Sequence, residues 1–192
     1  MKVCVFAASS SRIDSAYSAA ASKLGTLFAE AGMEVIYGGG GIGLMGNLAD
    51  AVLESGGNIT GVIPEFMRAE GWGHSRITET IVTQDMGERK KRMFEQADGV
   101  VALPGGIGTL EELTEAITLK QLGLYKGPIV ILNTLNYYKS FIEFLDHMIS
   151  GRFLRLEHKS IWEVVNTPEE VVTALKGYNG WVEDPRSIAK IF

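Results

Sequence analysis

Short apolar runs alternate with longer stretches of helical spacing along the chain. Between Ser15 and Ala31, for example, apolar side chains recur every three or four positions, which predicts a helix with one buried side. The runs rich in Val and Ile predict strands at Val3–Ala8, Glu34–Tyr37, Ile59–Ile63, Ile77–Val82, Val100–Leu103, Ile129–Leu132 and Ile161–Val165. Helices are predicted at Ser15–Ala31, Leu44–Glu54, Met86–Ala97, Thr109–Leu122, Tyr137–Ile149 and Pro168–Lys176.

The predicted strands are continuously apolar and are separated by helices, which is typical of a parallel sheet covered on both faces. We therefore expect an α/β fold, a Rossmann-like doubly wound parallel sheet, in a single domain over residues 1–192. The segment Phe66–Arg76 reads as an irregular excursion. The tail from Gly177 to Phe192 is expected to be an arm that packs on the surface or on a partner chain.

Glycine is the compositional anomaly, with 23 residues in 192. Six of them fall between Gly38 and Gly46, and three between Gly105 and Gly108. Both clusters directly follow a predicted strand, and ligands bind at the carboxyl ends of the strands in sheets of this kind. The glycines therefore predict two ligand-binding loops.

The bulk numbers exclude several classes of protein. A formal net charge of −5 lacks the basic face of a nucleic-acid binder. The single cysteine, Cys4, lies in an apolar run and reads as a small buried residue, so no internal disulfide is expected. No apolar run is long enough to span a bilayer, and neither end carries a lipidation motif. A cytoplasmic protein with no membrane partner is expected.

The first glycine loop contains the spacing GxGxxG between Gly41 and Gly46, with Glu65 about 20 residues further on. That arrangement fits a dinucleotide site. It follows the second strand instead of the first, however, and the signal is weak alone. A tight strand-to-helix turn without a ligand fits the same glycines.

The second loop runs from Pro104 to Glu112 and again joins a strand to a helix. Thr109 and Glu112 have the spacing of a capping box, a hydroxyl cap with a carboxylate three residues on. That interpretation leaves three glycines and the additional carboxylate of Glu111 unexplained. Free backbone N–H groups and Thr109 would suit a phosphate, and carboxylates one turn further could face the group that carries it.

The helix before this loop contains the charge run Glu88-Arg89-Lys90-Lys91-Arg92. A run like this is usually a solvated helix face. Met86, Lys90, Met93 and Ala97 nevertheless share one side of the helix, and Arg89 neighbours Met93. One or two of the four cations are therefore expected to point inward.

Together these segments resemble the LOG family of cytokinin riboside 5′-monophosphate phosphoribohydrolases. The resemblance runs from about Val3 to Phe153. It rests on Tyr37 to Gly46, Gly61 to Pro64, Asp85-Met86 with Arg89-Lys90, the PGGxGTxxE motif from Pro104 to Glu112, Ile117-Thr118, Gln121 to Gly123 and Asn136 to Tyr138. One departure is Ala8-Ser9-Ser10, where relatives usually read Gly-Ser-Ser. Relatives were long labelled lysine decarboxylases, but nothing in this sequence indicates a pyridoxal-phosphate site.

The resemblance implies hydrolysis of the N-glycosidic bond of a nucleoside 5′-monophosphate, a cytokinin riboside 5′-monophosphate or AMP, to free base and ribose 5-phosphate. It implies a homodimer, no cofactor, and Arg89 and Glu112 as the catalytic pair. Substrate-binding positions would be Glu70, Arg89, Lys90, Gly105, Gly106, Ile107, Gly108, Thr109, Leu110, Glu111, Glu112 and Thr118, with Ser9, Gly39 and Gly40 as phosphate contacts.

Residue chemistry suggests a mechanism and an alternative. Departure of the base leaves positive charge on the ribose. Glu112 would stabilise that charge and activate water, Glu111 would hold a ribose hydroxyl, and Arg89 would orient the carboxylate or the nucleotide. The alternative is a non-catalytic carrier of a phosphorylated ligand such as a pterin cofactor, which needs the glycine loops but not Glu112. His74, His147 and His158 lack ligand spacing, so no metal site is expected.

Overall fold

The computed structural model describes residues 1–182 and 184–189. Its centre is a seven-stranded sheet with the order β4-β3-β2-β1-β5-β6-β7, and all neighbouring strands are parallel. The strands are β1 (Lys2–Phe6), β2 (Glu34–Tyr37), β3 (Ile59–Pro64), β4 (Glu79–Thr83), β5 (Gly99–Ala102), β6 (Ile129–Leu132) and β7 (Glu163–Val165). The predicted single-domain α/β fold with a doubly wound parallel sheet is confirmed.

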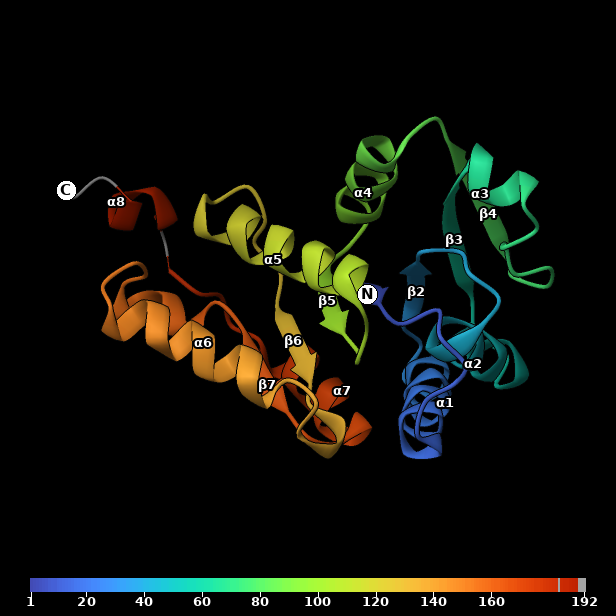
Figure 1. Cartoon of the computed structure of the whole chain (residues 1–192), viewed down its shortest axis with the longest axis horizontal. Coiled ribbons are helices and arrows are strands. Elements are labelled where there is room, and N and C mark those ends of the chain that lie inside the picture. Colours follow the sequence, from blue (N-terminus) through green and yellow to red (C-terminus); the bar gives the residue numbers. More distant parts are fainter. Residues whose placement is uncertain (183, 190–192) are drawn as a thin grey trace.

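Helices cover both faces of the sheet (Figure 1). They are α1 (Ser15–Glu30), α2 (Gly43–Glu54), α3 (Glu65–Ala69), α4 (Met86–Glu95), α5 (Ile107–Gln121), α6 (Lys139–Ser150), α7 (Pro168–Gly177) and α8 (Pro185–Ala189), with 3-10 turns η1 (Thr134–Asn136) and η2 (Leu156–Ser160).

Side chains of successive strand residues point to opposite faces, which divides the core in two. Val3 and Val5 of β1 pack in one cluster with α1, α2 and α7. Cys4 and Phe6 pack in the other cluster with α4, α5 and α6. The central strands β1, β3, β5 and β6 are almost fully buried because both of their faces are covered, whereas the edge strand β4 is largely exposed.

The strand order reverses between β1 and β5. From β1 the chain adds β2, β3 and β4 on one side, and β5 then returns to the other side of β1. Such a switch point opens a crevice at the carboxyl ends of the two central strands. Just beyond those ends, the N–H of Ala8 donates to the carbonyl of Pro104 at 3.2 Å, so the loops after β1 and β5 start side by side.

The segment predicted as irregular between Phe66 and Arg76 is partly helical, because α3 (Glu65–Ala69) begins directly after β3. The rest folds back over the first glycine loop through an antiparallel bridge between Gly40 and Gly73. His74 anchors it: its Nε2 lies 3.0 Å from Oδ1 of Asp50 on α2.

The predicted arm at 177–192 begins with the last residue of α7 and packs on the protein's own surface in its described part. The Trp181 indole N–H donates to the carbonyl of Glu157 at 3.0 Å. Helix α8 contacts α5, at the end of the molecule away from β4 (Figure 1). Residues 183 and 190–192 of this arm lie outside the described residues. No helix in the described part of the chain has the length and apolar character needed to cross a membrane.

Candidate active site

A cavity of about 600 Å³ lies at the switch point. The segments that line it are the end of β1 with its loop (residues 5–10), the first glycine loop, the start of α4 and the start of α5. Met67 and Trp72, from the segment that folds back over the first glycine loop, complete the wall. Both loops that glycine content singled out in the sequence therefore border one cavity.

Arg89 lies at the buried end of this cavity and is 7% exposed. Its Nε donates to the carbonyl of Val62 at 3.0 Å, and its Nη2 donates to the carbonyl of Gly38 at 3.2 Å. Its Nη1 donates to Oε1 of Glu112 at 2.9 Å. One side chain from α4 thus ties the ends of β2 and β3 to α5, which fixes the guanidinium in a single orientation.

Glu112 faces Arg89 from the second turn of α5 and is also 7% exposed. Burial raises the pKa of its carboxyl group above the ordinary value, and the positive charge and hydrogen bond of Arg89 oppose that rise. The carboxylate is therefore held in place by a cation and is more basic than a solvated glutamate.

The capping box that the spacing of Thr109 and Glu112 allowed is not formed. The N-cap of α5 is Gly106, and no side chain caps the helix end. Thr109 lies inside the first turn, where its side chain is buried against Gly105. The helix begins earlier than the spacing suggested, so Glu112 turns toward Arg89 and the first-turn N–H groups receive no side-chain partner.

The backbone N–H groups at the start of α5 are suited to binding an anion. Within the described residues, the backbone N–H groups of residues 106–109 donate to no protein acceptor. Gly106, Gly108 and Thr109 line the cavity. The start of a helix carries partial positive charge, so free donors here suit a phosphate.

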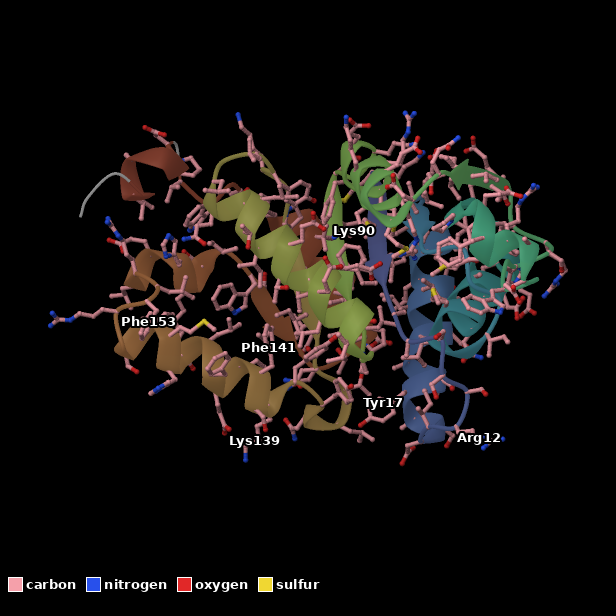
Figure 2. The ribbon with its side chains drawn as sticks, turned by 45° about the horizontal axis from the view of Figure 1, so that its top comes forward. Arg12, Tyr17, Lys90, Lys139, Phe141 and Phe153 are labelled. Atoms are coloured by element: carbon pink, nitrogen blue, oxygen red, sulfur yellow. The ribbon has the colours of Figure 1, made fainter. Side chains whose placement is uncertain are left out.

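Lys90 reaches α5 from the side of α4, as Figure 2 shows. Its ammonium group pairs with Glu111 and lies 2.9 Å from Oε2 of Glu115. Burial alone would lower its pKa, but the hydrogen bonds to the two carboxylates outweigh that effect and raise it. Of the four cations in the charge run, Arg89 is buried and Lys90 is mostly covered, as predicted, while Lys91 and Arg92 are exposed.

Of the predicted site residues, eight line the cavity and seven do not. Ser9, Gly40, Arg89, Gly106, Gly108, Thr109, Glu111 and Glu112 line it. Gly39, Glu70, Lys90, Gly105, Ile107, Leu110 and Thr118 do not. Gly39 has a positive φ of 78° and packs on Ile63, and the Thr118 hydroxyl donates to the carbonyl of Thr114 within α5. Glu70 is exposed at the end of α3.

Sequence reasoning missed an apolar wall. Met45, Met67, Trp72 and Met86 all line the cavity, and Trp72 is half exposed. A sequence signal was present in part, since Trp72 is an aromatic residue in a polar excursion, but only the docking of that segment brings it to the cavity. Among the described residues, no group of three or more His, Cys, Asp or Glu side chains is placed to hold a metal ion.

Comparison with known proteins identifies relatives over most of the chain. The family model described as "Possible lysine decarboxylase" matches residues 45–175. Cytokinin riboside 5′-monophosphate phosphoribohydrolase LOG7 of Arabidopsis thaliana is 38% identical over 177 residues, which cover 92% of this chain and 82% of the relative. The enzyme LOG of Oryza sativa subsp. japonica is 38% identical over 177 residues, with 92% and 73% coverage.

Solved structures share the fold. The molybdenum cofactor carrier protein of Chlamydomonas reinhardtii superimposes with a TM-score of 0.69 at 23% identity, over 92% of this chain and 96% of that one. An X-ray structure of a structural genomics target gives a TM-score of 0.71 at 27% identity, over 92% and 99%. The carrier's low identity shows a common architecture alone. The family model and the plant relatives show more: the chain belongs to the LOG family, the cytokinin riboside 5′-monophosphate phosphoribohydrolases.

Proposed function

We propose that the protein hydrolyses the N-glycosidic bond of a nucleoside 5′-monophosphate, releasing the free base and ribose 5-phosphate. The observation that carries this proposal is the buried pair of Arg89 and Glu112 in a cavity that is also lined by residues with free N–H donors. Family membership supports it, since curated relatives 36–38% identical are named as phosphoribohydrolases.

The start of α5 would bind the 5′-phosphate. The free N–H groups of residues 106–109 and the helix dipole favour a doubly charged anion. Ser9 and Gly40, across the cavity, are further candidates for phosphate or ribose contacts. Binding energy at the phosphate then positions the glycosidic bond against Glu112, one turn further along the helix.

Glu112 would act at the anomeric carbon C1′. As the bond from C1′ to the base nitrogen breaks, its electron pair leaves with the base and C1′ becomes an oxocarbenium-like centre. The carboxylate stabilises that positive charge and accepts a proton from the attacking water, whose oxygen bonds to C1′. The proton taken up by Glu112 is passed on to the departing base nitrogen, so the hydroxyl of the water ends on C1′, its proton ends on the base, and the carboxylate is regenerated. Arg89 orients the carboxylate, and Glu111 would hold a ribose hydroxyl.

The apolar wall would receive the base. Met45, Met67, Trp72 and Met86 offer one aromatic ring and three flexible thioethers beside the polar end of the cavity. Such a surface suits a purine and accommodates an apolar substituent on it. We therefore propose both AMP and a cytokinin riboside 5′-monophosphate as substrates.

The test is release of free base and ribose 5-phosphate from these two monophosphates, with adenosine as the unphosphorylated comparison. Glu112→Gln and Arg89→Lys should lower kcat at least about a hundredfold. Matched controls are Glu95→Gln and Arg92→Lys, exposed residues of α4 that form surface pairs and should retain activity. No release above that of the Glu112→Gln variant would overturn the proposal.

A non-catalytic carrier of a phosphorylated ligand is the alternative that the shared fold allows. A carrier needs the second glycine loop at the start of α5 (residues 104–109, the phosphate loop) but no buried carboxylate beside the sugar. Binding of a mononucleotide without turnover, unaffected by Glu112→Gln, would favour the carrier.

We also propose that the protein is a homodimer, as the family resemblance implies, and that it is located in the cytoplasm, as its composition suggests. Exposed apolar side chains such as Ile107 beside the cavity and Phe153 after α6 offer surface for a second copy. Light scattering during size-exclusion chromatography tests the dimer, and fractionation of cells tests the location.

A further inference from the structure

Tyr137, between η1 and α6, lies outside the cavity but touches the phosphate loop. Its hydroxyl Oη donates to the carbonyl of Gly105 at 2.6 Å. Gly105 precedes Gly106, whose N–H begins the row of free donors at α5. One tyrosine hydroxyl therefore holds the peptide group that links the β5 loop to the candidate phosphate site.

The C=O and N–H of a trans peptide point in opposite directions. Because Tyr137 draws the carbonyl of Gly105 away from the cavity, the N–H of Gly106 in the same peptide must point the other way. Gly106 lines the cavity, whereas Tyr137 and Gly105 do not. The hydrogen bond thus aims a donor at the space that the phosphate would occupy.

The turn that presents Tyr137 is strained. Leu135 and Asn136 adopt left-handed backbone conformations, with φ of 53° and 59°. Neither residue is glycine, and leucine in particular is disfavoured there. Asn133 holds the turn, since its side-chain oxygen accepts the N–H of Tyr138 at 2.8 Å. Backbone strain that is maintained by the surrounding structure is typical of functional sites.

Aromatic neighbours fix the ring. Tyr137 packs edge-on against Tyr138 and against Tyr17 of α1, with ring centroids 5.1 Å and 5.8 Å away. Tyr17 projects from α1 toward this segment (Figure 2). Tyr138 is buried and donates its own hydroxyl to the carbonyl of Leu103 at 2.7 Å, so the pair holds the loop at two points.

We propose that Tyr137 is a positioning residue for 5′-phosphate recognition, acting through the Gly105–Gly106 peptide. This inference rests on the proposed function, because it assigns the phosphate of that substrate to the start of α5. Without the hydroxyl the peptide is free to rotate, and the N–H of Gly106 loses its aim. The variant should therefore lose affinity for ligands that carry a phosphate and keep its affinity for ligands that lack one.

The experiment compares Tyr137→Phe with wild type in two measurements. Calorimetric titration with ribose 5-phosphate should show a Kd about three- to tenfold higher in the variant. Steady-state kinetics should show a similar rise in KM for AMP with kcat nearly unchanged, and no change in kcat/KM for adenosine. Tyr17→Phe is the matched control: it removes a hydroxyl from the neighbouring ring and should leave both measurements unchanged.

A third measurement separates positioning from damage to the fold. The amide signal of Gly106 in a nitrogen-15 spectrum should shift on addition of inorganic phosphate in wild type and respond weakly in Tyr137→Phe. Equal losses for AMP and adenosine, or an unchanged Kd for ribose 5-phosphate, would overturn the inference. If wild type cleaves no nucleotide, the proposed function fails, while the titration and the amide signal still decide the role of Tyr137.

Discussion

The guanidinium of Arg89 occupies the space into which a side chain at Gly38 would extend. A Cβ built on Gly38 would overlap Nη2 of Arg89, and the carbonyl of the same glycine accepts that group's hydrogen bond at 3.2 Å. The absence of a side chain at the end of β2 is thus what admits the arginine beneath the cavity. This glycine is needed for space, since its φ is not positive.

Gly38→Ala should therefore displace Arg89 and impair Glu112 indirectly. We expect kcat/KM to fall about a hundredfold, because catalytic groups displaced by an ångström lose that much. The free energy of unfolding should fall by about 1–3 kcal/mol from overpacking. Gly177→Ala, where a Cβ meets nothing within 4 Å, is the control and should be nearly neutral. Full activity of Gly38→Ala would contradict the placement of Arg89.

On the acid side of the pH profile, kcat/KM should begin to fall at a pH above 4.5, the ordinary pKa of a glutamate; this fall is the acid limb of the profile. Burial raises the pKa of Glu112, and the mechanism needs the ionised carboxylate, so kcat/KM falls as pH falls through this raised pKa. The charge of Lys90 lowers the pKa of Glu112. Lys90→Met should therefore move the limb to higher pH.

Lys91→Met is the matched control for that shift, because Lys91 is exposed and pairs with Glu95 on the same helix. Its profile should coincide with wild type. A limb at or below pH 4.5 in wild type, or a downward shift in Lys90→Met, would argue against Glu112 as the base.

Lys120 should destabilise the fold while it is charged. It is 1% exposed, has no carboxylate partner among the described residues, and lies 4.4 Å over the ring of Tyr178. Burial lowers its pKa from 10.5 to about 8. The unfolded chain binds the proton of the ammonium group more tightly than the folded chain does. The charged lysine therefore lowers the free energy of unfolding by its full amount below about pH 8, and this loss fades as pH rises toward 10.5.

Lys120→Met should thus raise the free energy of unfolding at pH 7 by about 2 kcal/mol, the charge penalty less the attraction to Tyr178. Urea unfolding at pH 7 and pH 10 measures it. The difference in the free energy of unfolding between the variant and wild type should be smaller at pH 10 than at pH 7. A variant less stable than wild type at pH 7 would show that the ammonium group is well solvated or paired.

Asp50 should act on substrate binding from outside the cavity. The N–H of Arg76 donates to Nδ1 of His74 at 3.1 Å, so Nε2 carries the proton and donates to Asp50. The Arg76 side chain pairs with the same carboxylate. These bonds seat the segment that carries Met67 and Trp72, so Asp50→Asn should raise KM for AMP several-fold with little change in kcat.

The control for Asp50→Asn is Glu65→Gln, which breaks the exposed pair with Arg68 at the start of the same segment. It should leave KM unchanged, since exposed pairs contribute little. Equal effects of Asp50→Asn on kcat and KM would instead indicate that the substitution disturbs Glu112 or Arg89.

Local patterns predicted most strands and helices, because the central strands of a parallel sheet covered on both faces read as apolar runs. They also predicted that one or two of the four cations of α4 point inward, and Arg89, which neighbours Met93, is buried. The spacing of Thr109 and Glu112 also allowed a helix cap, which the structure does not form. The true partner of Glu112 is 23 residues away, and a contact between two helices leaves no trace in local periodicity.

The apolar wall could not be predicted for a related reason. Trp72 reaches the cavity only because the following residues dock on α2 through Asp50, 24 positions from His74. Likewise, Tyr137 touches Gly105 across 32 positions. Sequence motifs predicted the loops and the proposed catalytic pair, while the contacts that position them come from distant segments.

The cavity is lined by residues between Val5 and Glu112, although the sheet extends to β7. When Glu112 has been synthesised, every side chain that lines the cavity is therefore present in the growing chain, while β6 and β7 are still to be made. Among the later residues, Tyr137 reaches the phosphate loop through its hydroxyl. Synthesis order thus separates the residues that line the cavity from the tyrosine that we propose aligns the loop.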